Sequence, residues 1–352
     1  MHFHESVLID TVDGFHCKTY SNHHPEGKII VKPKYIPSDI IKGEGLKRRF
    51  IFSRCMTRLN LFAKKEKVND NINQLRKRFP DYFLDTGSTW FFVIPKDKIM
   101  KVHDPRQGLK ELLEVPRKDL DNYLLAVVDL IELLTKSGVK KQDLGITHST
   151  LMGNYTPGIS DIDMIIFGKE NGWKILDFLK TATHPKLKWK TRGEWIRYYQ
   201  EHRTAESGHF TEEEYADHML KKFYEGTFDG NVFTLFTVEE PDEMWNDFDA
   251  ESYEPQGTAE VEGTVTDDHD SIVRPACYKI EGNVIGKDIK VKQVVTYSLP
   301  FMHQARKGDR IKACGLLEKV TPKDGDQYHR LTIGYFDAYT TDRREKEYLK
   351  VT

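Results

Sequence analysis

Two acidic residues separated by one position precede a short apolar run near the middle of the chain. Asp161 and Asp163 are followed by Met-Ile-Ile-Phe at residues 164–167. Side chains at positions i and i+2 of a strand point to the same face, so both carboxylates are expected to lie together. Neighbouring carboxylates repel unless a cation neutralises them, and Mg²⁺ with bound phosphates suits such oxygen ligands. The pair predicts a site for metal-bound phosphates, although D-x-D alone also begins ordinary strands.

A small-residue turn lies upstream of this pair. Residues 145–153 read Gly-Ile-Thr-His-Ser-Thr-Leu-Met-Gly, which predicts a strand, a turn and a short helix. The Ser149 hydroxyl and the free backbone N–H groups of the turn are suited to holding a phosphate. The alternative is that Ser149 only caps the helix. The succession of strand, serine turn, helix and acidic strand is more specific than either motif alone.

The elements around this segment alternate between helix and strand. Residues 120–134 repeat apolar side chains at helical spacing and end near Gly138, and Thr211 with Glu214 forms a capping box for a helix reaching about Tyr224. We therefore predict a mixed α/β domain over residues 116–253. Its other expected elements are strands at 144–147, 162–167 and 231–238, and helices at 171–181 and 192–203.

The flanking regions are predicted to be rich in β-structure. Residues 1–115 contain a hairpin signal at Asp13-Gly14, further strands at 27–31 and 90–94, and one helix around 68–79. Histidines 2, 4, 23 and 24 lack metal-site spacing and are expected to be exposed polar residues. Residues 254–345 alternate with period two and predict a small β-barrel, for which an OB-like barrel is the first choice and a sandwich the alternative. Its five expected strands are 258–266, 273–281, 287–297, 309–320 and 327–336. The predicted fold class is thus α+β and multidomain.

Composition excludes several classes of protein. The chain has 352 residues, of which 38% are hydrophobic and 31% charged, so extensive disorder is not expected. No run approaches the roughly 18 apolar residues of a membrane span, and the N-terminus does not resemble a secretory signal. Cys17, Cys55, Cys277 and Cys314 form no C-x-x-C motif, which argues against zinc and a disulfide scaffold. We expect a soluble cytoplasmic protein without a membrane partner.

Charge is distributed unevenly along the chain. Residues 41–80 carry 12 Lys/Arg against 3 Asp/Glu, whereas residues 205–254 carry 2 against 15. A basic block is suited to phosphate groups, although a solvated surface is its commoner explanation. With an OB-like barrel, the block makes RNA or DNA the leading macromolecular partner. Tyr278, Tyr297 and Tyr328 are candidates for base stacking or for the barrel core.

The segment 144–168 resembles the polymerase-beta-like nucleotidyltransferase superfamily, and especially its archaeal-type members. The resemblance rests on the Gly-Ile-Thr-His-Ser-Thr-Leu-Met-Gly turn and on Ser-Asp-Ile-Asp at residues 160–163. It implies transfer of a nucleoside monophosphate from an NTP to an acceptor hydroxyl, with release of pyrophosphate. Asp161 and Asp163 would hold two Mg²⁺ ions. Implied nucleotide contacts are His148, Ser149, Arg192, Arg197 and Lys221, with Arg203 and Lys222 as further candidates.

Two departures from the family pattern leave an alternative open. The family places Gly where His148 stands, and a β-carbon would hinder a backbone that needs a positive φ. A third carboxylate usually stands on a later strand, where this chain has Thr234, while Asp229 and Glu240 flank that strand. The alternative is a catalytically inactive protein of the same fold that binds nucleotides or nucleic acid.

Overall fold

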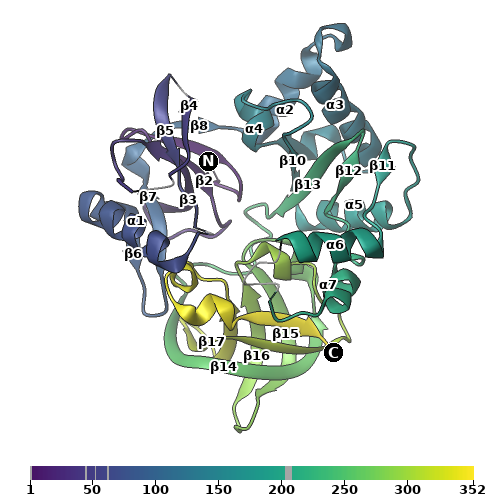
Figure 1. Ribbon diagram of the computed structural model, residues 1–352. Coiled ribbons are helices and arrows are strands. Elements are labelled where there is room, and N and C mark those ends of the chain that lie inside the picture. Colours follow the sequence, from purple (N-terminus) through teal and green to yellow (C-terminus); the bar gives the residue numbers. More distant parts are fainter. Residues whose placement is uncertain (1, 44–45, 52, 62, 203–207) are drawn as a thin grey trace.

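The computed structural model describes residues 2–43, 46–51, 53–61, 63–202 and 208–352. Its strands form three sheets in chain order, which Figure 1 shows around a common centre: the first at left, the second at right, the third below. Helices accompany mainly the second sheet, so the fold is a mixture of α and β structure. No helix in the described ranges is both long and apolar enough to cross a membrane.

The first sheet is built from the N-terminal region. The Asp13-Gly14 turn joins β1 to β2 as predicted, and Gly14 takes a positive φ of 80°. Helix α1 (Lys65–Arg78) covers part of the sheet by burying Val68, Ile72 and Leu75. The strands are β1 (Leu8–Thr11), β2 (His16–Thr19), β3 (Lys28–Pro37), β4 (Arg48–Ile51), β5 (Arg54–Arg58), β6 (Phe83–Asp85), β7 (Trp90–Pro95) and β8 (Ile99–His103).

The second sheet has the strand order β11-β12-β13-β10-β9 and contains the predicted acidic strand. β10 pairs in parallel with β13 and antiparallel with β9. The bounds are β9 (Leu144–Ile146), β10 (Ile162–Phe167), β11 (Leu187–Lys188), β12 (Glu225–Phe228) and β13 (Asn231–Val238), with helices α3 (Asn122–Thr135), α4 (His148–Met152), α5 (Lys169–Thr181), α6 (Arg192–His202) and α7 (Glu212–Met219).

Helix α2 (Pro105–Glu114) packs on this second unit although it precedes residue 116. Its Leu109 and Leu112 are buried in the same apolar cluster as Ile162 and Met164 of β10. The Asp104 side chain caps the helix by accepting from two backbone N–H groups. The polypeptide therefore enters the second core about ten residues before the predicted boundary.

The third sheet closes on itself. Strands β14, β15, β16, β18 and β17 pair in that order, and β17 pairs with β14 to complete a ring, while β19 adds to β17. β16 and β18 are parallel, and the other pairings are antiparallel. The strands are β14 (Glu251–Asp267), β15 (Ala276–Val284), β16 (Lys290–Thr296), β17 (Arg310–Pro322), β18 (Tyr328–Ile333) and β19 (Tyr348–Val351).

A buried polar network joins the three units, the third through Asp270, which accepts from Nζ of Lys169 at 2.6 Å. Glu239, which follows β13, accepts from Nε2 of His23 at 2.8 Å and from Nζ of Lys169 at 3.3 Å. The backbone oxygen of Glu239 also contacts Nδ1 of His4 at 3.0 Å. The expectation that the four histidines are exposed is therefore wrong. The rings of His4 and His23 pack at the junction between sheets, with exposures of 8% and 3%, and His2 and His24 are half-buried.

Candidate functional site

The carboxylate pair lies at the start of β10, the strand between β9 and β13. Asp163 is the second residue of the strand and Asp161 directly precedes it. Ile162 and Met164 point into the apolar core of the second unit, so the intervening acids face the opposite side of the sheet. Asp161 is exposed, whereas the Asp163 side chain is 19% exposed. The two acids thus lie on the same face of the sheet, as predicted.

The turn before α4 brings His148 onto Asp163. Nδ1 of His148 lies 3.1 Å from Oδ2 of Asp163, and the backbone N–H of Thr147 donates to the carbonyl oxygen of Asp163 at 3.0 Å. Burial, together with the positive charges of Lys18 and Lys34, lowers the pKa of His148 to about 4 despite the neighbouring carboxylate. The imidazole is therefore neutral at pH 7 and can donate one hydrogen bond to Asp163.

His148 also has the backbone conformation for which the sequence motif favours glycine. Its φ is +50°, in the left-handed region, where a β-carbon crowds the following carbonyl. Thr147, and not Ser149, occupies the N-cap of α4, so Ser149 is not the cap residue. Ser149 is half-buried and lies close in sequence to the carboxylates. Its contact with a phosphate stays a prediction.

Two lysines of the first sheet, Lys18 and Lys34, interact electrostatically with Asp163. Burial opposes ionisation of Asp163, but His148, Lys34 and Lys18 together outweigh it and lower the pKa of this carboxyl. Burial and the charge of Arg274 lower the pKa of Lys18 to about 8, which leaves it largely protonated at pH 7. Sequence reasoning missed both lysines because β2 and β3 lie more than a hundred residues from β10.

A third carboxylate shares this face of the sheet. Asp163 of β10 pairs with Thr234 of β13, and Thr234 pairs in turn with Glu225 of β12. Directly paired residues point to the same face. Burial, followed by the charges of Asp163 and Glu225, raises the pKa of Asp161. Glu225 is thus a third acid of the site. The family pattern predicts this acid on the strand next to β10, at Thr234 of β13, whereas Glu225 lies one strand further, on β12.

A hairpin signal in the sequence could have revealed Glu225. Asp229-Gly230 joins β12 to β13, and both residues have positive φ values, 50° and 80°. Such Asp-Gly pairs favour two-residue hairpins. The predicted helix from Thr211 does begin with the capping box but ends at Met219, so Glu225 belongs to a strand.

The other acids considered as the third carboxylate lie elsewhere. Asp229 accepts a hydrogen bond from Nζ of Lys186 at 2.8 Å. Glu240 lies beyond the far end of β13 and pairs with Arg106. Neither belongs to the row formed by Asp163, Thr234 and Glu225.

The predicted cationic contacts are on the outer surface of α6 and around α7. Arg192 forms an ion pair with Asp217, and Arg197 and Lys221 are exposed. Among the described contacts, none of these three side chains touches Asp161 or Asp163. Lys222 is buried and donates to the carbonyl oxygen of Pro300 at 2.5 Å. Arg203 lies outside the described residues.

Two of the three candidate stacking tyrosines are core residues. Tyr278 is fully buried and donates to the carbonyl oxygen of Phe301 at 2.7 Å. Tyr297 is buried against Phe91 and Tyr335. Base stacking by these two rings is therefore excluded in this arrangement, and only Tyr328 is partly exposed.

The fit of the site to Mg²⁺ depends on donor chemistry. Within the residues that the structure describes, no three His, Cys, Asp or Glu side chains are grouped so as to hold a metal ion. Mg²⁺, however, commonly uses one or two carboxylates and completes its shell with water and phosphate oxygens. Burial and the charges of Asp163 and Glu225 oppose the ionisation of Asp161, while Lys190 favours it, so a cation there would relieve repulsion. The two aspartates fit such an ion.

Comparisons with known proteins indicate relatedness over nearly the full length of the chain. The chain is 27% identical over 350 residues to an uncharacterized protein of Methanocaldococcus jannaschii, covering 98% of this chain and 97% of that protein. No family model matches the chain, and no solved structure gives a significant match. The relationship thus extends through all three sheets.

Proposed function

We propose that this protein is a Mg²⁺-dependent nucleotidyltransferase that moves a nucleoside monophosphate from an NTP to an acceptor hydroxyl. The observation that carries the proposal is the row of acids on one sheet face, Asp161, Asp163 and Glu225. Lys18 and Lys34 act on Asp163, and Lys190 forms an ion pair with Glu225. Such a row combines oxygen ligands for a hard cation with positive charge for phosphate.

The reaction assigns distinct tasks to these side chains. The acceptor oxygen bonds to the α-phosphorus, the bond to the oxygen bridging to the β-phosphate breaks, and pyrophosphate leaves. Glu225 is the candidate to take the hydroxyl proton, since it stands beside the carboxylate pair without belonging to it. Lys18 and Lys34 would hold phosphate oxygens. Mg²⁺ held by Asp161 and Asp163 would offset charge that develops on the transferred group.

The architecture supports the same proposal at the level of the fold. The acidic strand β10 follows a strand, a turn and the short helix α4, as in the resemblance described above. We further propose that the ring formed by β14–β18 is a small OB-like barrel, supported by its five-strand closure. Fold analogy alone does not establish a reaction, so the carboxylates carry the argument.

Thermal unfolding in the presence of Mg²⁺ and each NTP tests the binding step. Ligand at about 100 times its Kd stabilises a protein by about 2.7 kcal/mol, which should raise the melting temperature of the wild type by several degrees. Asp161→Asn should abolish this rise. The matched control Asp324→Asn changes an exposed acid in the loop between β17 and β18 and should preserve it. An unchanged rise in Asp161→Asn would overturn the proposed metal site.

A second candidate function is nucleotide binding without catalysis. It is favoured by the contact between His148 and Asp163, which engages one carboxylate oxygen, and by Thr234 at the position expected for an acid. This candidate predicts the same thermal shift but no incorporation of label from an α-labelled NTP into any acceptor.

A further inference from the structure

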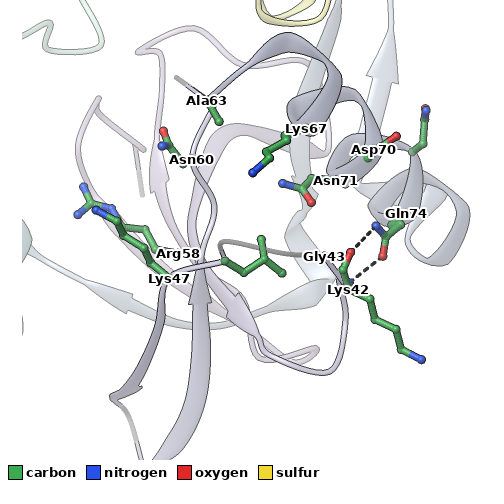
Figure 2. Close-up of a pocket in the computed structure, with 12 residues that line it drawn as sticks. Lys42, Gly43, Lys47, Arg58, Asn60, Ala63, Lys67, Asp70, Asn71 and Gln74 are labelled. Carbon is green, nitrogen blue, oxygen red and sulfur yellow. Dashed lines mark hydrogen bonds between the residues drawn. The ribbon is translucent and has the colours of Figure 1, made fainter.

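A basic cavity lies in the first unit, apart from the carboxylate row. It has a volume of about 690 Å³ and lies between α1, the start of β4 and the end of β5. Four cationic residues and one acid line it: Lys42, Lys47, Arg58, Lys67 and Asp70. Figure 2 shows Lys67 pointing from α1 into this space, whereas the Lys42 side chain extends away from it.

Hydrogen bonds to α1 hold the cavity wall in place, and three of its cations have no carboxylate partner among the described residues. Gln74 of α1 accepts from the backbone N–H of Lys42 at 2.8 Å and donates to its carbonyl oxygen at 2.9 Å. The backbone N–H of Arg58 donates to the carbonyl oxygen of Lys47 at 3.0 Å, which places these two cations side by side. Within the described residues, Lys47, Arg58 and Lys67 form no ion pair with a carboxylate. An anionic ligand would supply the missing charge.

The hairpin of β4 and β5 adds an aromatic side chain to this charge. Its two strands contain Arg48, Arg49, Arg54 and Arg58 and no acidic residue. Phe50 is 79% exposed and shares a face with Arg48, two positions away. The strand pairing puts Arg49, Arg54 and Arg58 on the opposite face of the hairpin. An exposed ring beside an arginine suits single-stranded nucleic acid, because a base can stack on the ring while the cation contacts a phosphate.

Positive charge continues from the cavity to the carboxylate row. The backbone N–H of Leu59, next to Arg58, donates to the carbonyl oxygen of Lys34 at 3.2 Å. Lys34 in turn interacts electrostatically with Arg58 and Arg49 on one side and with Asp163 on the other. A strand lying along these cations would bring its end toward Asp161 and Asp163.

We propose that the cavity and the β4–β5 hairpin bind single-stranded nucleic acid, whose terminal hydroxyl is the acceptor at the carboxylate row. The acceptor role rests on the proposed function, whereas the binding itself does not. A single strand is favoured over a duplex, because its unpaired bases are free to stack on Phe50.

Fluorescence anisotropy with labelled oligonucleotides of about 12 residues, in EDTA and over a range of KCl concentrations, tests this proposal. Single-stranded RNA or DNA should bind the wild type more tightly than a duplex of the same length, and the two single strands distinguish the sugar. Arg58→Ala and Lys67→Ala should each weaken binding and reduce the salt slope by about 0.7, the value for one lost single-strand phosphate contact.

Matched variants separate the aromatic contribution from general charge. Phe50→Ala should weaken binding about tenfold with little change in salt slope. Met100→Ala, which removes another exposed apolar side chain (63% exposed), and Lys118→Ala, which removes an exposed cation outside the cavity, should bind like wild type. Asp161→Asn should also retain binding, so loss of nucleotidyl transfer in that variant is distinguishable from loss of this site.

Three results would overturn the proposal. One is the absence of single-strand binding at about 50 mM salt, where phosphate contacts are strong. Another is equal affinity of wild type, Arg58→Ala and Lys67→Ala. The third is displacement of the oligonucleotide by inorganic tripolyphosphate at equal phosphate concentration, which would indicate a site for small anions alone.

Discussion

Glu225 is the side chain whose role in the proposed reaction can be separated most clearly from metal binding. Glu225→Gln should lower turnover by about 10² or more, the usual contribution of a general base, because the amide cannot accept the hydroxyl proton. The thermal shift with Mg²⁺ and NTP should persist. The control is Asp229→Asn, which changes the acid at the hairpin turn and should leave turnover unchanged. Turnover is measured by initial rates. A larger loss of turnover in Asp229→Asn than in Glu225→Gln would make Asp229 the third acid of the site.

His148 offers a test of backbone strain beside the carboxylates. Both His148→Ala and His148→Gly remove the imidazole that contacts Asp163, but only glycine relieves the φ of +50°. The glycine variant should therefore be more stable than the alanine variant by about 1 kcal/mol. Urea denaturation of the two variants measures this difference. Equal stabilities would mean that the turn does not require a left-handed residue.

Among the secondary-structure elements, the β12–β13 hairpin carries Glu225 into the site. Gly230 has a φ of 80°, and no atom lies within 4 Å of where its β-carbon would be. Gly230→Ala should destabilise the protein by about 1 kcal/mol through backbone strain alone. Gly193→Ala, at an equally open helical position without positive φ, should instead be neutral or stabilising. Thermal unfolding of both variants checks the sign; equal effects would contradict the turn geometry.

The sequence allowed elements to be predicted where local periodicity determines them. The strand at 231–238, the capping box at Thr211 and the Asp13-Gly14 hairpin all have the expected form. The sheet face shared by Asp161 and Asp163 also follows from spacing alone. Proximity of Lys34 and Glu225 to these acids depends on how distant strands pair, which no local pattern encodes.

Burial explains the predictions that failed. His23 appeared polar and exposed by residue type, yet Glu239 supplies a buried hydrogen-bonding partner 216 residues away. For Tyr278 the sequence leaves base stacking and the barrel core both open, and the partners of its hydroxyl inside the third unit decide for the core. In both cases a long-range contact satisfies the polar atom, so side-chain type alone could not indicate exposure.

Across the whole molecule, buried histidines make stability depend on pH. Burial lowers the pKa of His24 and His218 to about 3 and that of His4 to about 4. Since these groups titrate near 6.5 when unfolded, the unfolded state binds more protons as the pH falls below 6.5, and stability is lost between there and pH 3–4. Burial raises the pKa of Glu347 to about 7, which acts in the opposite direction.

The effect of the three histidines on stability is larger than the opposing effect of Glu347. Between pH 7 and pH 5, each of the three histidines should lower the free energy of unfolding by about 2 kcal/mol, while Glu347 should raise it by about 2 kcal/mol. The melting temperature at pH 5 should therefore be several degrees below that at pH 7, by calorimetry in buffers of matched ionic strength. A melting temperature that is equal or higher at pH 5 would contradict the burial of these three histidines in their neutral form.

Transfer of label from an α-labelled NTP, in Mg²⁺ and with single-stranded RNA or DNA as acceptor, tests the central claim most directly. Neutralising either aspartate removes a ligand and a charge from the site, so Asp161→Asn and Asp163→Asn should each lower turnover by about 10³ or more. Asp324→Asn should match wild type. The account predicts label in the acceptor with wild type and almost none with the two variants; wild-type incorporation no greater than that of Asp161→Asn, with every NTP, would contradict it.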